Sequence, residues 1–325
     1  MVGSSWALPR RVMEELRGAG FDDVQLVGPD ELAELQDDVA VLVHLAAGDH
    51  DALARRRRSA AFGAGELLEA ARRTGASAVV LLSSALVYGA WPNNPVPLTE
   101  DQALRPDNGL AFARQLALVE QLVDDWRVAA TDRSVAVLRP APAMAADGTT
   151  TLARTLAAGP AARLGDDDVP AQFLHLDDLA HAIVVAVTAR LDGVYNVAPD
   201  GWVPGARVRA LSGKASRFRL PDRLGEVVAR LRWRFQRGPI PPGLRSYTAS
   251  PWVVANDRMR ATGWTPTVTN EQAFVEGTEA RWWTMLTPKR KQELSLGAAG
   301  VLGAAALATT ALLVQRARRR RRRDR

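Results

Sequence analysis

The sequence predicts a doubly wound α/β fold with a parallel sheet, followed by a smaller C-terminal region and a C-terminal transmembrane helix. Short apolar runs alternate with amphipathic helical patterns through the first two-thirds of the chain, which is typical of a parallel sheet covered by helices. From about Gly201 the composition shifts to Arg, Pro and Gly with interspersed aromatic residues. A charge-free stretch then lies close to the C-terminal end.

Four segments are rich in Val and Leu and apolar on both faces, as expected of strands that are buried on both sides. They are residues 23–28, 39–47, 76–84 and 134–140. Residues 10–20 and 63–75 read as amphipathic helices that end at Gly20 and Gly75. Because strand and helix alternate, we expect right-handed βαβ connections.

A further helix is predicted over residues 108–122, NGLAFARQLALVEQL. Its apolar residues recur at helical spacing. They are Leu110, Ala113, Leu116, Ala117, Val119 and Leu122. Only Arg114 and Glu120 in this segment carry a group that can hold or move a proton.

The composition excludes several kinds of site. The chain of 325 residues contains no Cys, so disulfides, thiolate metal sites and Cys nucleophiles are absent. Its four His do not have the spacing of zinc ligands, and we expect no metal. Lys occurs only at Lys214, Lys289 and Lys291, which leaves the first 213 residues without any lysine.

The net charge of +6 is concentrated at one end of the chain. Eight Arg lie in the last ten residues, so the remainder is close to neutral. A basic tail on a near-neutral body does not indicate nucleic-acid binding.

Residues 295–314 contain no charge over twenty residues, which as a helix would span roughly 30 Å, the thickness of a bilayer core. A buried soluble helix is the alternative, but an Arg run follows directly. We therefore expect a single-pass membrane anchor whose Arg tail contacts anionic lipid head groups. The positive-inside rule would place the tail in the cytoplasm. This placement conflicts with the absence of an N-terminal signal peptide, which favours a cytoplasmic location for the main domain. We expect the main domain in the cytoplasm, with either an atypical span or an Arg tail that returns to the lipid head groups.

Seven segments in order resemble the landmarks of the extended short-chain dehydrogenases/reductases, the NAD-dependent epimerase/dehydratase family. They are VLVHLAA (41–47), VVLLSSALVYG (79–89), PLTEDQALRP (97–106), VAVLRPA (135–141), FLHLDDLAHAIVVAV (173–187), GVYNVAPD (193–200) and ATGWTP (261–266). The resemblance implies a Rossmann-like domain of the type that binds NAD or NADP over residues 1–200. A substrate-region-like segment would follow over 201–288, and the transmembrane helix with its tail over 289–325.

In that family a serine polarises the substrate, and a Tyr-x-x-x-Lys pair on the next helix acts as general acid and base. Ser84, or its neighbour Ser83, matches the serine. Phe112 stands where the tyrosine belongs and Leu116 where the lysine belongs. Neither side chain titrates, so the proton-transfer pair is absent. Tyr88 is the remaining phenol near the strand ends and a candidate substitute acid.

The resemblance also identifies the cofactor side, where Gly3, Ala46, Ala47 and Ser83 match positions beside NAD or NADP. Gly3 aligns with the first glycine of the phosphate-binding loop, but Trp6 and Pro9 replace the other two. Dinucleotide binding is therefore doubtful. His175, Asp177 and Asp178 are read as structural residues, with one of the two Asp as a helix N-cap.

Two functions remain open. The first is a membrane-anchored, catalytically impaired family member that acts as a binding or scaffold module for a small molecule or a protein. The second is an active NAD(P)-dependent epimerase or reductase with relocated catalytic groups, which acts on a nucleotide-sugar or lipid-type substrate.

Overall fold

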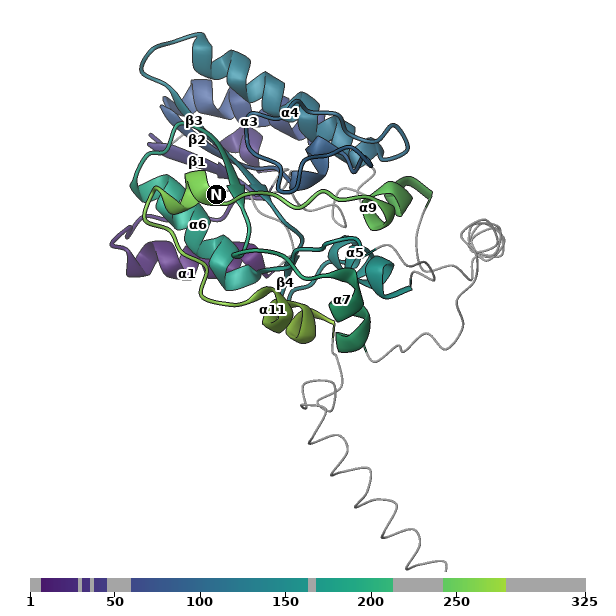
Figure 1. Ribbon diagram of the computed structural model, residues 1–325. Coiled ribbons are helices and arrows are strands. Elements are labelled where there is room, and N and C mark those ends of the chain that lie inside the picture. The colour runs from purple at the N-terminus through teal and green to yellow at the C-terminus, as the bar shows by residue number, and fades with distance from the viewer. Residues whose placement is uncertain are drawn as a thin grey trace, which may run out of the picture. The chain divides into compact units, whose positions relative to one another are not determined.

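The computed structural model describes residues 7–28, 31–35, 38–45, 60–162, 168–212 and 242–278. All of them belong to one compact unit, Met1–Ala280. Within these ranges four parallel strands form the main sheet in the order β1-β2-β3-β6 (Figure 1). The strands are β1 (Val41–His44), β2 (Ala78–Leu82), β3 (Ser134–Pro140) and β6 (Gly193–Val197). The predicted parallel α/β architecture is confirmed.

Helices cover both faces of this sheet. Helices α3 (Ala60–Thr74) and α4 (Ala111–Val128) pack together on one face. Helices α1 (Leu8–Gly18) and α6 (Leu176–Thr188) pack together on the other, as Figure 1 shows. All five residues of β2 are buried, since this central strand is covered on both sides.

Smaller elements complete the described part of the chain. A two-stranded sheet joins β4 (Ala143–Met144) to β5 (Leu174–His175). The helical elements are η1 (Leu32–Glu34), η3 (Ala85–Tyr88), α5 (Thr151–Ala162), α7 (Gly205–Leu211), η4 (Pro242–Leu244), α9 (Arg245–Ala249), α10 (Asp257–Arg260) and α11 (Asn270–Gly277). Phe173 and Phe274, with ring centroids 4.9 Å apart, pack in a second hydrophobic cluster.

The predicted helix ends at Gly20 and Gly75 are confirmed, because helices α1 and α3 end just before them and both glycines have positive φ, 91° and 69°. The predicted strand over 23–28 is wrong. Only Val27 forms a bridge there, and Leu26 is 45% exposed. With side chains open to solvent, this segment lacks the cover that a doubly buried strand requires.

The helix cap expected at Asp177 or Asp178 is also wrong. Helix α6 begins at Leu176, and His175 is its N-cap, with the imidazole accepting the Asp177 N–H. Asp178 instead accepts hydrogen bonds from the backbone and hydroxyl of Thr267 and from the Val268 N–H. It therefore attaches the segment before α11 to the sheet-covering helix.

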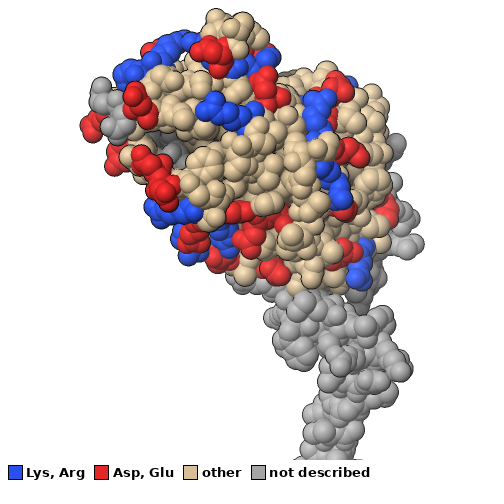
Figure 2. All heavy atoms as spheres, turned by 90° about the vertical axis from the view of Figure 1, so that its left-hand side faces the viewer, with Lys and Arg blue, Asp and Glu red and all other residues tan. Residues whose placement is uncertain are grey.

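No helix in the described ranges is long and apolar enough to cross a bilayer. The predicted span, residues 295–314, lies outside those ranges. On the face shown in Figure 2, acidic and basic side chains are interspersed. Exposed ion pairs such as Arg10–Glu14 and Arg72–Glu69 are examples of such opposite charges on neighbouring helical turns.

His44, the last residue of β1, is buried among apolar side chains. It is 2% exposed, and its Nδ1 has no hydrogen-bond partner in the described structure. Burial lowers the pKa of His44 to about 4, because the imidazolium would lose its hydration. In the unfolded chain His44 takes up a proton near pH 6.5, but in the folded chain it does so only near pH 4. Acidification through this window therefore favours unfolding.

We expect the protein to lose about 2 kcal/mol of stability from this group between pH 7.5 and pH 5. A His44→Leu variant should lack that part of the loss, because it has no imidazole to protonate. Urea denaturation at the two pH values measures the difference. His181→Gln is the control, since His181 is half-exposed and bound to Glu15. Equal losses in the native protein and in His44→Leu would contradict the prediction.

Candidate functional site

Ser83 and Ser84 follow the carboxyl end of β2 and have different surroundings. Ser83 is 1% exposed, and its hydroxyl donates to the Glu120 carboxylate on α4. Ser84 is half-buried, and its oxygen accepts the Leu86 N–H at 3.3 Å, which caps η3. Ser84 is therefore the serine whose hydroxyl borders open space, whereas the Ser83 hydroxyl is hydrogen-bonded inside the protein.

Glu120 also binds Arg139 on β3 in a buried ion pair. The Arg139 Nε and Nη2 atoms donate to Glu120 Oε2 at 3.1 and 2.6 Å, and both side chains are 6% exposed. Burial opposes the charge on Arg139, but the adjacent Glu120 carboxylate raises the pKa of the guanidinium above its ordinary value. The Arg139 guanidinium therefore remains charged across the physiological pH range.

The buried network continues through Tyr88 to β6. Arg139 Nη1 donates to the Tyr88 hydroxyl at 2.7 Å, and that hydroxyl donates to Asn196 Oδ1 at 2.8 Å. Burial raises the pKa of Tyr88, although Arg139 opposes the rise. With its ring 1% exposed and its oxygen bonded on both sides, Tyr88 serves the interior. We call these five side chains (Ser83, Glu120, Arg139, Tyr88 and Asn196) the buried polar network.

Beside Ser84 lies a cavity of about 50 Å³ that Phe112 also lines. The other lining residues come from β2, β3, β4, α5, α6 and their connections. They are Leu82, Ser83, Leu86, Pro140, Ala141, Pro142, Ala143, Thr150, Leu152, Ala153, Leu156, Leu179 and Trp252. None of these side chains titrates. Leu116, at the position of the family's lysine, is 0% exposed and packs in the core.

A second cavity, of about 20 Å³, adjoins the first and shares Ala141, Pro142, Leu156 and Trp252 with it. Tyr247 on α9 lines this second cavity, and its hydroxyl donates to the Leu86 carbonyl at 2.8 Å. Burial raises the pKa of Tyr247 to about 12. Its ring meets Trp252 edge-on with centroids 5.4 Å apart. Sequence reasoning did not single out this phenol.

The structure therefore brings Ser83, Ser84 and Phe112 to one cavity, but the Ser83 hydroxyl is bonded to Glu120 and the Tyr88 hydroxyl to Arg139 and Asn196. The predicted cofactor residues Gly3, Ala46 and Ala47 lie outside the described residues. In the described part of the chain no group of His, Asp and Glu side chains is arranged to hold a metal ion.

Sequence reasoning noted Glu120 only as an ionisable group and missed Arg139. A signal for the pair was present. Glu120 interrupts the apolar stripe of Leu116 and Val123, and Arg139 interrupts an otherwise apolar strand. A charge at each of two buried positions on neighbouring elements predicts that the two are partners.

The strand order and the position of Ser84 allow a comparison of this chain with known proteins. The profile of the NAD dependent epimerase/dehydratase family matches residues 5–198. The chain belongs to this family. Among curated proteins, a 3-diazoavenalumate denitrifying reductase of Streptomyces sp. is 35% identical over 167 residues, covering 48% of this chain and 52% of the reductase. An uncharacterized protein of Mycobacterium tuberculosis is 32% identical over 123 residues, covering 38% of this chain and 33% of that protein.

The match thus spans about half, or less, of the length of these relatives. Among solved structures, the Thermus thermophilus UDP-glucose 4-epimerase, in complex with NAD, has a TM-score of 0.61 at 17% identity, covering 85% of this chain and 96% of that one. RMD from Pseudomonas aeruginosa, complexed with NADPH, has a TM-score of 0.55 at 21% identity, covering 84% and 97%. At these identities the likeness concerns the fold.

Residues 1–6, which precede α1, lie outside the described residues, and one described feature of α1 is unfavourable to the pyrophosphate of a nicotinamide dinucleotide. A pyrophosphate is held by N–H groups in the first turn of a helix such as α1. Pro9 in that turn is buried and has no N–H. A Cβ added at Gly148 would lie 3.0 Å from the Ala7 Cβ, so another loop packs against the start of α1. Phe112 and Leu116 carry no polar side-chain atom. Neither residue can therefore exchange a proton with a substrate that lies beside such a cofactor.

We expect Arg139→Met to lower stability by about 3–5 kcal/mol, because it leaves the Glu120 carboxylate buried without its partner. The double variant Glu120→Leu/Arg139→Met should recover much of the loss, since it removes both charges. Urea denaturation of the single and double variants measures the coupling. As a control, Arg127→Met disrupts a partly exposed ion pair with Asp124 and should cost less than about 1 kcal/mol. Additive losses in the double variant would contradict the prediction.

Proposed function

We propose that this family member is membrane-attached and catalytically impaired, and that it acts as a binding or scaffold module. The observation that carries the proposal is the cavity beside Ser84. None of its lining side chains titrates. General acid–base catalysis needs a titratable group within hydrogen-bond reach of the reacting atoms. Phe112 at the tyrosine position retains a ring but cannot donate a proton.

The two adjoining cavities favour an uncharged, largely apolar ligand. Their polar side chains are few, with Ser83, Ser84, Thr150, Gln172 and the Tyr247 hydroxyl among mostly aliphatic and aromatic neighbours. No Arg or Lys lines either cavity in the described structure. A buried diphosphate would need such a cation to offset its loss of hydration. This lining supports a lipid-type ligand over a nucleotide sugar, although with about 50 and 20 Å³ the two cavities admit only a small apolar part of such a ligand.

The alternative is an active NAD(P)-dependent epimerase or reductase with relocated catalytic groups. The relatives favour this alternative, since the Streptomyces protein is a reductase and the two compared structures hold NAD or NADPH. Tyr247 is the nearest phenol available as a relocated acid. Its pKa of about 12 is poorly matched to proton transfer at neutral pH.

The proposed membrane attachment rests on the uncharged residues 295–314 and the Arg-rich residues after them. Such a segment would cross the bilayer once. The Arg side chains would contact anionic lipid, and the main domain would lie in the cytoplasm. A lipid-type ligand would then be delivered from the membrane itself.

Calorimetric titration with NAD(H) and NADP(H) tests the proposed loss of catalysis. We expect no saturable binding tighter than about 1 mM, because Pro9 removes a pyrophosphate donor. Circular dichroism of the same sample verifies that the protein is folded. Ser84→Ala should leave the biological activity intact, whereas a working epimerase would lose it. Micromolar binding would support the alternative function instead.

Carbonate extraction of cell membranes tests the anchor. We expect the full chain to remain in the membrane fraction. The double variant Leu302→Arg/Leu312→Arg should move to the soluble fraction, because each buried charge opposes insertion by about 2.5–3.5 kcal/mol. The matched double variant Leu302→Ala/Leu312→Ala is the control and should stay with the membrane. Identical fractionation of the Arg variant and the native chain would refute the anchor.

A further inference from the structure

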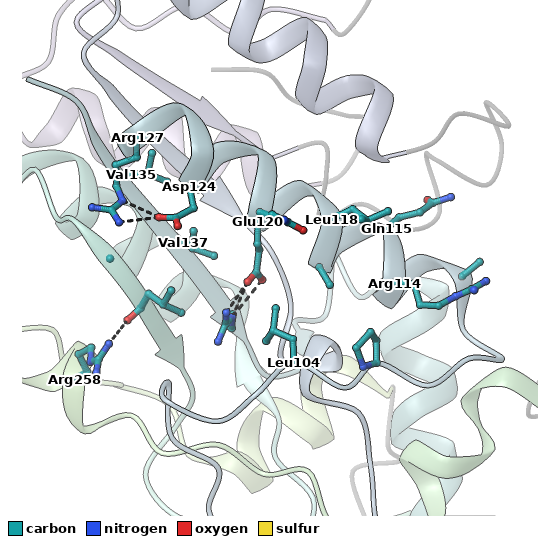
Figure 3. Close-up of a pocket in the computed structure, with 17 residues that line it drawn as sticks. Leu104, Arg114, Gln115, Leu118, Glu120, Asp124, Arg127, Val135, Val137 and Arg258 are labelled. Carbon is teal, nitrogen blue, oxygen red and sulfur yellow. Dashed lines mark hydrogen bonds and ion pairs between the residues drawn. The ribbon is translucent and has the colours of Figure 1, made fainter. Parts of the chain in front are cut away.

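A groove of about 960 Å³ lies on the α4 side of the sheet (Figure 3). Helix α4 forms one wall, and the segment with Leu104 and Pro106 forms the other. Its floor is made by Val135 and Val137 of β3 and by Val194 of β6. The groove and the cavity beside Ser84 have no lining residue in common. Its volume lies within the range of small-molecule sites, roughly 300–1,000 Å³.

The surface of the groove is mainly apolar. In addition to the valine floor, Leu104 and Ala117 face it, and Leu118 lies at its rim with 54% of its surface exposed. Val135 and Val137 on the floor are only 2% and 5% exposed, so Leu118 and the half-buried Leu104, Ala117 and Val194 supply much of the accessible apolar surface. An occupant of this groove therefore needs an extended apolar part.

The charges that line the groove neutralise one another with one exception. Glu120 and Arg139 form the buried pair at its base. Arg127 binds Asp124 and Asp192, and Arg258 binds Asp101.

Arg114 has no acidic partner among the residues that the structure describes. Figure 3 shows Arg114 at one end of the groove and Arg127 at the other. The groove thus presents one unneutralised cation at one end of an apolar surface, which complements an anionic head group.

The edge of β6 excludes one class of occupant. An extended peptide would add to that edge through free backbone groups. Here the Asn196 N–H donates to Glu100, and the Val194 carbonyl accepts from Arg258. Because these two backbone groups are already bonded, a strand-like partner has little to pair with.

We propose that this groove binds an amphipathic organic anion, an acyl chain that ends in a carboxylate. The carboxylate binds Arg114, where the positive end of the α4 dipole adds to the attraction. The acyl chain lies along the valine floor toward Arg127. Arg114 and Arg127 are thirteen positions apart. The helix between them spans about 20 Å, which is enough for a chain of a dozen or more carbons.

The test is calorimetric titration of the full-length protein with dodecanoate and, in parallel, with dodecanol. Arg114→Gln should weaken dodecanoate binding about tenfold and leave dodecanol binding unchanged, since only the carboxylate needs the cation. Leu118→Glu should weaken dodecanoate binding by a similar factor, whereas Leu118→Lys should not weaken it. Leu122→Glu, on the same helix but outside the groove, is the matched control and should have no effect.

Ala117→Phe fills the groove and should abolish binding of both probes. The proposal is overturned if dodecanoate binds Ala117→Phe as tightly as the native chain, or if Arg114→Gln changes nothing. Sedimentation velocity tests the other possible occupant of the groove, which is a second copy of this chain. If Leu118→Glu dissociates an oligomer and leaves dodecanoate binding unaltered, the groove is a subunit interface and the proposal is wrong.

Discussion

The buried ion pair between Glu120 and Arg139 is the interaction on which this structure depends. It joins α4 to β3 at the centre of the sheet, and through Tyr88 and Asn196 it extends to η3 and β6. Two charges inside a core are tolerated only when each is fully bonded. The segments that contribute to this network are therefore fixed relative to one another. The positions of Ser84 and Phe112 follow from that constraint.

The residues that hold the site in place, the buried polar network, differ from the residues at positions 112 and 116 that were expected to carry out its chemistry. Glu120 lies one helical turn after Leu116, but it directs its carboxylate to Arg139 and Ser83 rather than into the cavity. The residues expected to move a proton could thus be replaced by Phe112 and Leu116 without removing any member of the buried polar network. An apolar side chain at 116 instead adds to the core, where it is completely buried.

The sequence predicted the parts of the fold whose signals are local. The apolar runs that became β1, β2 and β3 and the glycines after α1 and α3 were found because burial on both faces and helix termination depend on neighbouring residues. The failures depended on contacts distant in sequence. Residues 23–28 have strand-like composition, but in the described structure only Val27 forms a bridge and Leu26 is 45% exposed. Asp178 binds Thr267 and Val268 instead of capping α6. The inward turn of Ser83 likewise depends on Glu120, 37 residues later.

The blocked edge of β6 has a consequence for the behaviour of the protein at high local concentration. An open edge strand pairs readily with the same strand of another molecule, which begins aggregation. Glu100 and Arg258 occupy backbone groups of β6 with charged side chains, and they do so from two separate segments of the chain. Copies of a protein meet one another more often as its local concentration rises. The charged side chains along the edge of β6 would prevent the edge strands of two copies from pairing.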